Sequence, residues 1–218
     1  MTTDAATLWT ATHAERARLA DDLAGLTAEQ WATPSLCGDW TVEEVVAHLT
    51  AAASLGRWRW IGSMLGARFD PAVHNARRLA EHRGATPAET LERFRAVVTS
   101  TAAPSGHTAA WLGEVVVHGE DVRRPLGIAD DPPTATTTPV AEFFASRDFT
   151  VAGKTLSRSL RLEATDGPFA TGEGPLVAGP TLALVMALAG RTPHLDHLDG
   201  PGVATLRERL STPPAAGR

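Results

Sequence analysis

The chain has few of the features that would assign a protein to a special class. Its 218 residues include a single cysteine, Cys37, which excludes a framework of internal disulfide bonds. It has no apolar run as long as the roughly 18 residues of a membrane-spanning helix, and no Lys/Arg cluster typical of nucleic-acid binding. The first twenty residues carry charges at helical intervals, so we expect no signal peptide. These absences favour the cytoplasm, with no membrane or nucleic-acid partner.

What is present is typical of a globular protein. Apolar residues make up 43% of the chain and charged residues 21%, and the formal net charge is −5. The length suffices for one large domain or two small ones. The clearest shift in composition is a stretch rich in Pro, Thr and Asp at residues 129–139. We therefore expect a domain over residues 1–128, a linker over 129–139 and a second domain over 140–218.

The first domain is expected to contain four amphipathic helices, because apolar residues recur there at helical spacing. Thr41 and Glu44 form a capping box at the start of the second helix, and Thr86 opens the third. The expected helices cover about residues 4–24, 42–55, 87–98 and 108–124, with Pro125 and Gly127 stopping the last one and residues 66–85 irregular or only partly helical. Four helices joined by modest loops predict a four-helix bundle.

The second domain is expected to be a small α+β unit. Its sequence alternates between apolar and polar residues over short stretches, which is typical of strands. The expected strands cover residues 154–157, 159–165 and part of 169–177, and the expected helices cover residues 140–144, 180–189 and 203–210. The fold class of the whole chain is therefore expected to be α+β.

Glu114 and His118 are the most informative pair of residues. They lie four residues apart on an expected helix, so both side chains project from the same face. The three valines between them indicate burial, and buried polar groups need partners. A divalent metal accepts both ligand types. His48 on the second helix is the candidate third ligand, and Asp121 is spaced to accept a hydrogen bond from a ligating histidine.

Other interpretations of these residues stay open at this point. His48 fits an ordinary core histidine, and Glu114 with His118 fits a solvent-side pair. Cys37 fits either a nucleophile or a structural loop cysteine. Trp111 shares the rough face of Glu114, where a pocket wall and a plain core residue are both expected. The histidines of the polar turn near residue 195, His194 and His197, are expected on the surface.

Residues 31–42, WATPSLCGDWTV, lead into residues 45–49, VVAHL, and resemble the opening motif of the mycothiol-dependent maleylpyruvate isomerase family. This family belongs to the DinB-like metalloenzyme bundles. Glu114-x-x-x-His118-x-x-Asp121 is similar to its fourth-helix motif. Further segments are similar to its middle part, at residues 69–77, and to its sterol-carrier-like C-terminal domain, at residues 160–165, 177–180, 188–191 and 195–198. The resemblance covers nearly the whole chain.

The resemblance implies a divalent metal, usually zinc, held by His48, Glu114 and His118. It also implies mycothiol as a cosubstrate, and an activity as a cis–trans isomerase or a thiol S-transferase. In the C-terminal domain it implies a catalytic arginine, for which Arg191 is the nearest candidate. A helix C-terminal arginine that complements the dipole is the alternative for this residue. Residues that would line the thiol pocket are Asn75 and Trp111.

The loop sequence departs from the family pattern, which often reads Cys-Pro-Gly-Trp where this chain has CGDW at residues 37–40. Asp39 would reshape the entrance to the site or assist the helix cap. Two further function classes remain open: a bundle that binds a metal or thiol without catalysis, with a ligand-binding C-terminal domain, and a partner-binding protein without metal. We expect a monomer that acts on a small electrophile, whose identity the sequence does not reveal.

Overall fold

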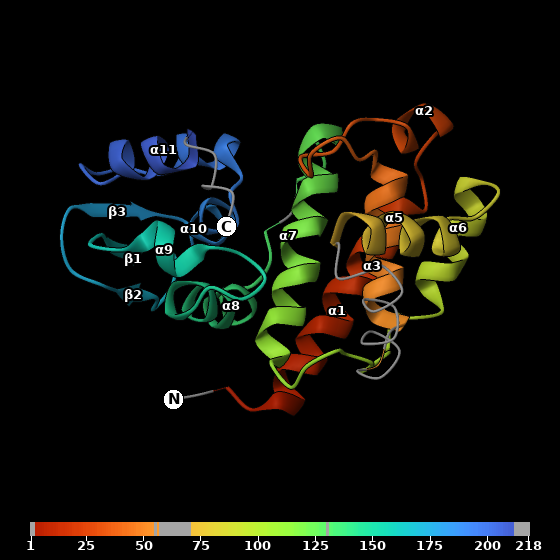
Figure 1. Cartoon of the computed structure of the whole chain (residues 1–218), viewed down its shortest axis with the longest axis horizontal. Helices are drawn as coiled ribbons and strands as arrows, with labels where there is room; N and C mark the ends of the chain where they lie inside the picture. The colour runs from red at the N-terminus through yellow and green to blue at the C-terminus, as the bar shows by residue number, and fades with distance from the viewer. Residues whose placement is uncertain (1–2, 55, 57–70, 130, 212–218) are drawn as a thin grey trace. The chain divides into compact units, whose positions relative to one another are not determined.

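The computed structural model describes residues 3–54, 56, 71–129 and 131–211, except for the side chains of residues 71–76. The chain divides into two compact units, Met1–Asp130 and Asp131–Arg218. Figure 1 traces the helices of the first unit and the mixed helices and strands of the second. The expected α+β fold class is confirmed. No described helix combines the length and the apolar character that a membrane crossing needs.

The described part of the first unit is helical. Its helices are α1 (Ala5–Leu23), α2 (Ala28–Trp31), α3 (Val42–Ser54), α5 (Pro71–His82), α6 (Pro87–Arg95) and α7 (Thr108–Leu126). Helix α7 packs along α1 and α3, and α3 also contacts α5 and α6. The four expected helices correspond to α1, α3, α6 and α7. The segment expected to be irregular or partly helical contains α5, and residues 69–70 of the expected middle motif lie outside the described residues.

The core of the first unit fills the space between these helices. Helix α3 contributes an apolar stripe that is almost fully buried, because valines and a leucine recur on one face. The stripe and its main partners from α1, α6 and α7 are Val42, Val45, Val46, Leu49, Leu19, Leu23, Phe94, Val115 and Val122. This packing fixes the spacing of α3 and α7, the two helices on which the candidate metal ligands lie.

Helix α3 begins where the sequence predicts. The Thr41 hydroxyl accepts the Glu44 backbone N–H at 3.3 Å, and the Glu44 carboxylate accepts the Thr41 N–H at 2.8 Å. Buried Glu43 then connects α3 to its neighbours, accepting hydrogen bonds from Thr90 at 2.9 Å and from Arg83 at 3.0 Å. The cap and this network set the start of the helix that carries His48.

Helix α7 runs two residues further than expected at its end, to Leu126. Pro125 lies inside its last turn, and Gly127 ends the helix in the left-handed conformation at φ 66°. A proline at this position cannot donate to the carbonyl four residues earlier, which belongs to Asp121. That carbonyl instead accepts the backbone N–H of Leu36 at 3.1 Å. Proline therefore does not stop the helix here, because a loop residue supplies the missing donor.

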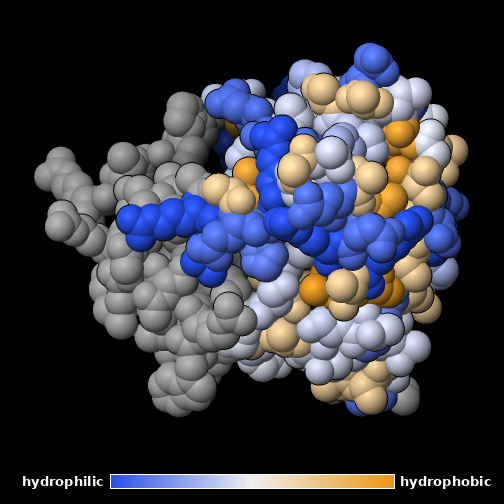
Figure 2. Space-filling view, turned by 90° about the vertical axis from the view of Figure 1, so that its right-hand side faces the viewer, coloured by the Kyte–Doolittle hydropathy of each residue, from blue (hydrophilic) through white to orange (hydrophobic). Residues whose placement is uncertain are grey.

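The outer side of α6 faces solvent. Figure 2 views the molecule from the side on which α6 lies and shows mostly hydrophilic residues with separate hydrophobic ones among them. Helix α6 carries ion pairs between Arg95 and Glu92 at 2.8 Å and between Arg93 and Glu89 at 2.5 Å. Exposed pairs of this kind contribute little to stability, so α6 is held mainly by its buried residues Leu91 and Phe94.

The second unit combines a small sheet with helices. Its elements are α8 (Thr134–Ser146), α9 (Gly153–Ser157), β1 (Arg161–Ala164), β2 (Ala170–Thr171), β3 (Leu176–Gly179), α10 (Thr181–Leu188), the 3-10 helix η1 (Thr192–His197) and α11 (Val203–Ser211). The strand order is β2-β1-β3, with β1 antiparallel to β2 and parallel to β3. Leu162 pairs with both Thr171 and Val177. The apolar helix α10 is buried against α8 and η1.

One strand expected in this unit is wrong. Residues 154–157 form α9 and not a strand, because the Asp148 carboxylate accepts both the Thr155 N–H at 3.0 Å and its hydroxyl at 2.6 Å, which fixes a turn. Four alternating residues are too few to exclude a helix. The short strand expected within residues 169–177 is found as β2. That stretch holds β2 and the start of β3, joined by a turn in which Gly172 has φ 75°.

Helix α8 begins earlier than expected. It starts at Thr134, so residues 134–139 of the expected linker are helical. Threonine is a poor helix former, and this is why the sequence favoured a linker. Thr136 and Thr137 are buried together with Val140 and Ala141, so tertiary packing outweighs the local preference.

Replacing Thr41 by Ala is expected to lower the free energy of unfolding by about 1 kcal/mol, because it removes the helix cap that precedes His48. Thr41→Ser keeps the hydroxyl and should change the stability by less than about 0.5 kcal/mol. Urea unfolding of the three proteins measures both effects. Equal stability of the Ala and Ser variants would contradict the role of the cap.

Candidate metal centre

Helices α3 and α7 bring together the three residues that the sequence predicts as metal ligands. One ligand atom each from His48, Glu114 and His118 lies within 4.8 Å of the other two. The Nε2 atom of His48 is 2.7 Å from Oε1 of Glu114, and the Nε2 atom of His118 is 3.5 Å from the same oxygen. We call this group the His/Glu/His set. The i, i+4 spacing on α7 accounts for the contact between Glu114 and His118. The packing of α3 against α7 accounts for the contact between His48 and Glu114.

The His/Glu/His set is largely shielded from water. The side chains of His48, Glu114 and His118 are 17%, 19% and 11% exposed. Burial alone would raise the pKa of Glu114, but hydrogen bonds with His118 and His48 hold that pKa well below its usual range. Burial alone would lower the pKa of His118, yet hydrogen bonds with Asp121, Cys37 and Glu114 raise it well above its usual value. Positive charge at His118 therefore balances the carboxylates around it.

Asp121 lies where the sequence places it, one turn after His118. Its carboxylate Oδ2 is 2.9 Å from Nδ1 of His118, and its side chain is fully buried. This contact favours a proton on Nδ1, so that loss of the other ring proton would leave the Nε2 lone pair directed toward Glu114 and His48. Asp121 thus orients the His118 ring for a ligand on the Nε2 side.

Trp40 contacts the His/Glu/His set in a way that sequence reasoning missed. Its ring centroid is 4.9 Å from that of His48, and the His48 and His118 rings meet edge to face at 5.0 Å. Trp40 lies in the loop just before the cap of α3. The contact depends on how the loop before α3 turns, for which the sequence holds no periodic signal.

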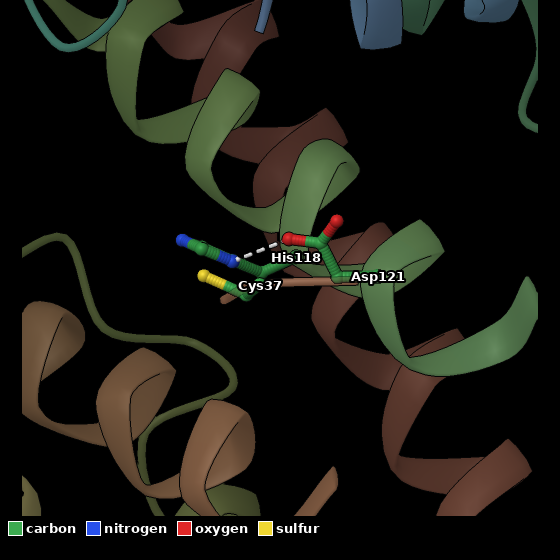
Figure 3. Close-up of side chains that lie close together, drawn as sticks. All are labelled: Cys37, His118 and Asp121. Atoms are coloured by element: carbon green, nitrogen blue, oxygen red, sulfur yellow. Dashed lines mark hydrogen bonds and ion pairs between the residues drawn. The ribbon is translucent and has the colours of Figure 1, made fainter. Parts of the chain in front are cut away.

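Cys37 lies beside His118 in the fold, although the two are far apart in the sequence. Cys37, His118 and Asp121 offer ligand atoms that lie within 4.8 Å of one another. Figure 3 shows the sulfur next to the His118 ring and the hydrogen bond between that ring and the Asp121 carboxylate. We call this group the Cys/His/Asp set. Asp39 in the same loop is exposed, so it does not line the described site.

Two further candidates, Trp111 and Asn75, lie on helices of the first unit. Trp111 lies on α7, but its indole N–H donates to the Ser105 carbonyl at 3.0 Å. Asn75 lies in α5, and its side chain is outside the described residues. Their part in a thiol pocket stays a prediction.

Arg191 and His194 belong to the second unit. The Arg191 guanidinium donates to the Ala189 carbonyl at 2.7 Å, just after α10, which fits the helix-end alternative. A catalytic role for Arg191 stays a prediction. His194 is only 3% exposed, so the expectation of a surface residue is wrong. It is buried because η1 packs against α10.

Without metal, the protein is expected to be most stable between about pH 4.5 and 6.5, the usual values for Glu114 and His118. The lowered pKa of Glu114 stabilises the fold above 4.5, and this contribution is lost as the pH falls. The raised pKa of His118 stabilises the fold below 6.5, and this contribution is lost as the pH rises. Denaturant unfolding from below pH 4.5 to above pH 6.5, with a chelator present, measures the profile.

The control for this profile is the double variant Glu114→Gln/His118→Gln, which lacks both charges. Its free energy of unfolding should change less with pH than that of the wild type, both below pH 4.5 and above pH 6.5. Wild-type and control profiles of the same shape would contradict the electrostatic role of the pair.

The chain is similar to known proteins in both sequence and structure. Residues 12–111 match the family model described as the mycothiol maleylpyruvate isomerase N-terminal domain. No curated protein matches the chain. Two solved structures are similar to it: a crystal structure of the mycothiol-dependent maleylpyruvate isomerase, at 16% identity and TM-score 0.64, and a histidine-to-alanine mutant of that isomerase, at 17% identity and TM-score 0.62.

Both similarities cover 91% of this chain and 93% of the other chain. At this level of identity they establish the fold. The resemblance predicted from the sequence is thereby confirmed. Residues 12–111 of the chain are similar to the mycothiol maleylpyruvate isomerase N-terminal domain, and the chain has the fold of the mycothiol-dependent maleylpyruvate isomerase.

Proposed function

We propose that the protein is a metal-dependent enzyme that uses mycothiol as a cosubstrate, as a thiol S-transferase or a maleylpyruvate-type cis–trans isomerase. The observation that carries the proposal is the convergence of His48, Glu114 and His118 within 4.8 Å. Residues 12–111 of the same unit, which include His48, match the isomerase N-terminal domain. A metal held by these three donors would support assignment to an enzyme class. The names of the similar structures support mycothiol as the cosubstrate.

The residues present fit a divalent metal. They offer two imidazole nitrogens and one carboxylate oxygen, which is a donor set typical of catalytic zinc. The shared contact of both imidazoles with one Glu114 oxygen means that all three donors already point to a common region. A dication there would take over the charge balance that the raised pKa of His118 supplies in its absence. Three protein donors leave room for an exchangeable ligand.

Each residue of the site has a distinct part in the proposed activity. His48, Glu114 and His118 would hold the metal, which when bound lowers the pKa of a thiol and supplies a nucleophile near neutral pH. Asp121 fixes the Nδ1–H tautomer of His118, so that Nε2 is free to bind. Trp40 covers one side of the His48 ring and restricts its rotation.

The two candidate reactions use the same nucleophile and differ in what happens to the thiol. In an isomerase the thiol adds to an activated double bond and leaves after the bond has rotated. In a transferase it stays on the electrophile. The choice depends on residues around the electrophile, and the fold alone does not determine it.

Purified wild-type protein is expected to carry a divalent metal at near-stoichiometric level, with zinc as the first candidate. His48→Ala should lose most of it, because two protein donors remain. His197→Ala, which removes an exposed histidine of the second unit, should keep the wild-type content. Elemental analysis of the three proteins provides the test, and metal-free wild type would refute the metal centre.

Metal-loaded protein is expected to turn over maleylpyruvate or another electrophile only when mycothiol is present. Product analysis across a panel of electrophiles distinguishes isomerisation from conjugation. Stoichiometric metal without thiol-dependent turnover on any substrate would favour a bundle that binds metal or thiol without catalysis.

Asp121→Asn is expected to weaken metal binding by roughly 10- to 100-fold, because an amide orients the His118 ring less strongly than a carboxylate does. Competition with a chromophoric chelator measures the affinity. Circular dichroism confirms folding of the variant, since Asp121 is fully buried. Unchanged affinity in a folded variant would contradict the orienting role.

A further inference from the structure

The Cys/His/Asp set offers a second arrangement of metal-binding atoms that the proposed reaction does not use. Cys37 Sγ, a His118 nitrogen and an Asp121 oxygen lie within 4.8 Å of one another (Figure 3). Among the described residues, this set shares only His118 with the His/Glu/His set. The two sets therefore approach one imidazole ring from different sides, since Nε2 faces Glu114 and Nδ1 faces Asp121.

The position of Cys37 is fixed by its loop. The Leu36 N–H donates to the Asp121 carbonyl at 3.1 Å, which joins the loop to the turn of α7 that carries the set. The Cys37 N–H donates to the Ser35 hydroxyl at 3.0 Å, and the Trp40 N–H donates to the Cys37 carbonyl at 3.2 Å. The sulfur is thus held beside His118 by the backbone on both sides of it.

The chemistry of the two sets differs. Both contain an imidazole and a carboxylate, but only the Cys/His/Asp set contains sulfur. Soft, thiophilic ions prefer thiolate ligands, whereas imidazole and carboxylate ligands suit zinc and similar ions. The buried Asp121 carboxylate and the half-buried Cys37 provide a partly covered position for a cation.

We propose that Cys37, His118 and Asp121 form a second site, for a thiophilic divalent ion, that competes with the His/Glu/His set for His118. On binding, the ion displaces the thiol proton of Cys37 and the Nδ1 proton of His118. The ring starts with a proton on each nitrogen and retains the one on Nε2, which faces Glu114. No electrons are transferred, and the displaced protons pass to solvent.

The shared ring makes the two sites mutually exclusive. In the His/Glu/His set, His118 binds through Nε2 and donates its Nδ1 proton to Asp121. In the Cys/His/Asp set, it binds through Nδ1 and directs its Nε2 proton toward Glu114. A neutral imidazole has one lone pair on nitrogen, so it serves one site at a time. A thiophilic ion would therefore displace the first metal.

The test uses Cd²⁺, because a thiolate bound to this ion gives an ultraviolet charge-transfer band. Cys37 is the chain's only cysteine, so any such band reports on this sulfur. Cd²⁺ is titrated into metal-free full-length protein without added thiols. We expect a saturable band in the wild type and in His48→Ala, which keeps the Cys/His/Asp set, and loss of the band in Cys37→Ser.

Calorimetry on the same samples measures Cd²⁺ binding independently of the charge-transfer band. Cd²⁺ binding without a charge-transfer band, a band that does not saturate, or no Cd²⁺ binding at all would each overturn the proposal. Circular dichroism verifies that Cys37→Ser is folded. These readouts need no turnover, so they remain decisive even if the proposed thiol-dependent activity fails.

Competition between Cd²⁺ and the metal of the His/Glu/His set tests whether both sites use His118. Cd²⁺ is added to zinc-loaded protein, and released Zn²⁺ is followed with an indicator dye. In the wild type, Zn²⁺ release should rise together with the band, and Cys37→Ser should need more Cd²⁺ for the same release. A band that forms while Zn²⁺ stays bound would overturn the competition.

Discussion

The contact of Glu114 with two imidazoles is the constraint on which the site depends. It joins α3 to α7 by polar groups inside a unit whose other contacts between these helices are apolar. Apolar packing alone sets the distance between two helices but specifies their rotation and register only weakly. A short contact between His48 and Glu114 forms at one register only, so the buried polar group restricts the bundle to a single arrangement.

Sequence reasoning identified the parts of the site that depend on local spacing. The i, i+4 relation of Glu114 and His118, the i+3 position of Asp121 and the cap before α3 are all contained in short segments. His48 required the assumption that the second and fourth helices face each other in a bundle, and the family resemblance agreed with it. The contacts of Cys37 and Trp40 with the two histidines were not predictable, because they depend on a loop held by a hydrogen bond to a carbonyl more than eighty residues away.

The errors in the second unit have a similar origin. Four alternating residues in α9 and the threonine-rich start of α8 carry weak local preferences, and tertiary packing determined the structure that formed.

The loop at Gly38 differs from the loop of the family pattern. Its φ of 59° is closed to proline, so a chain that reads Cys-Pro-Gly-Trp must turn this loop differently. Cys37 therefore lies beside His118 in a loop conformation that a proline at residue 38 would exclude.

Pro125 has a consequence that reaches beyond helix α7. Because it lacks an N–H group, it leaves the Asp121 carbonyl available to the loop, and the loop in turn holds Cys37 beside the metal ligands. Any other residue there would supply a competing donor from within the helix. The helix would gain a hydrogen bond while the loop lost part of its anchor. A substitution that strengthens the scaffold would then loosen the site, so stability and function make opposing demands at this position.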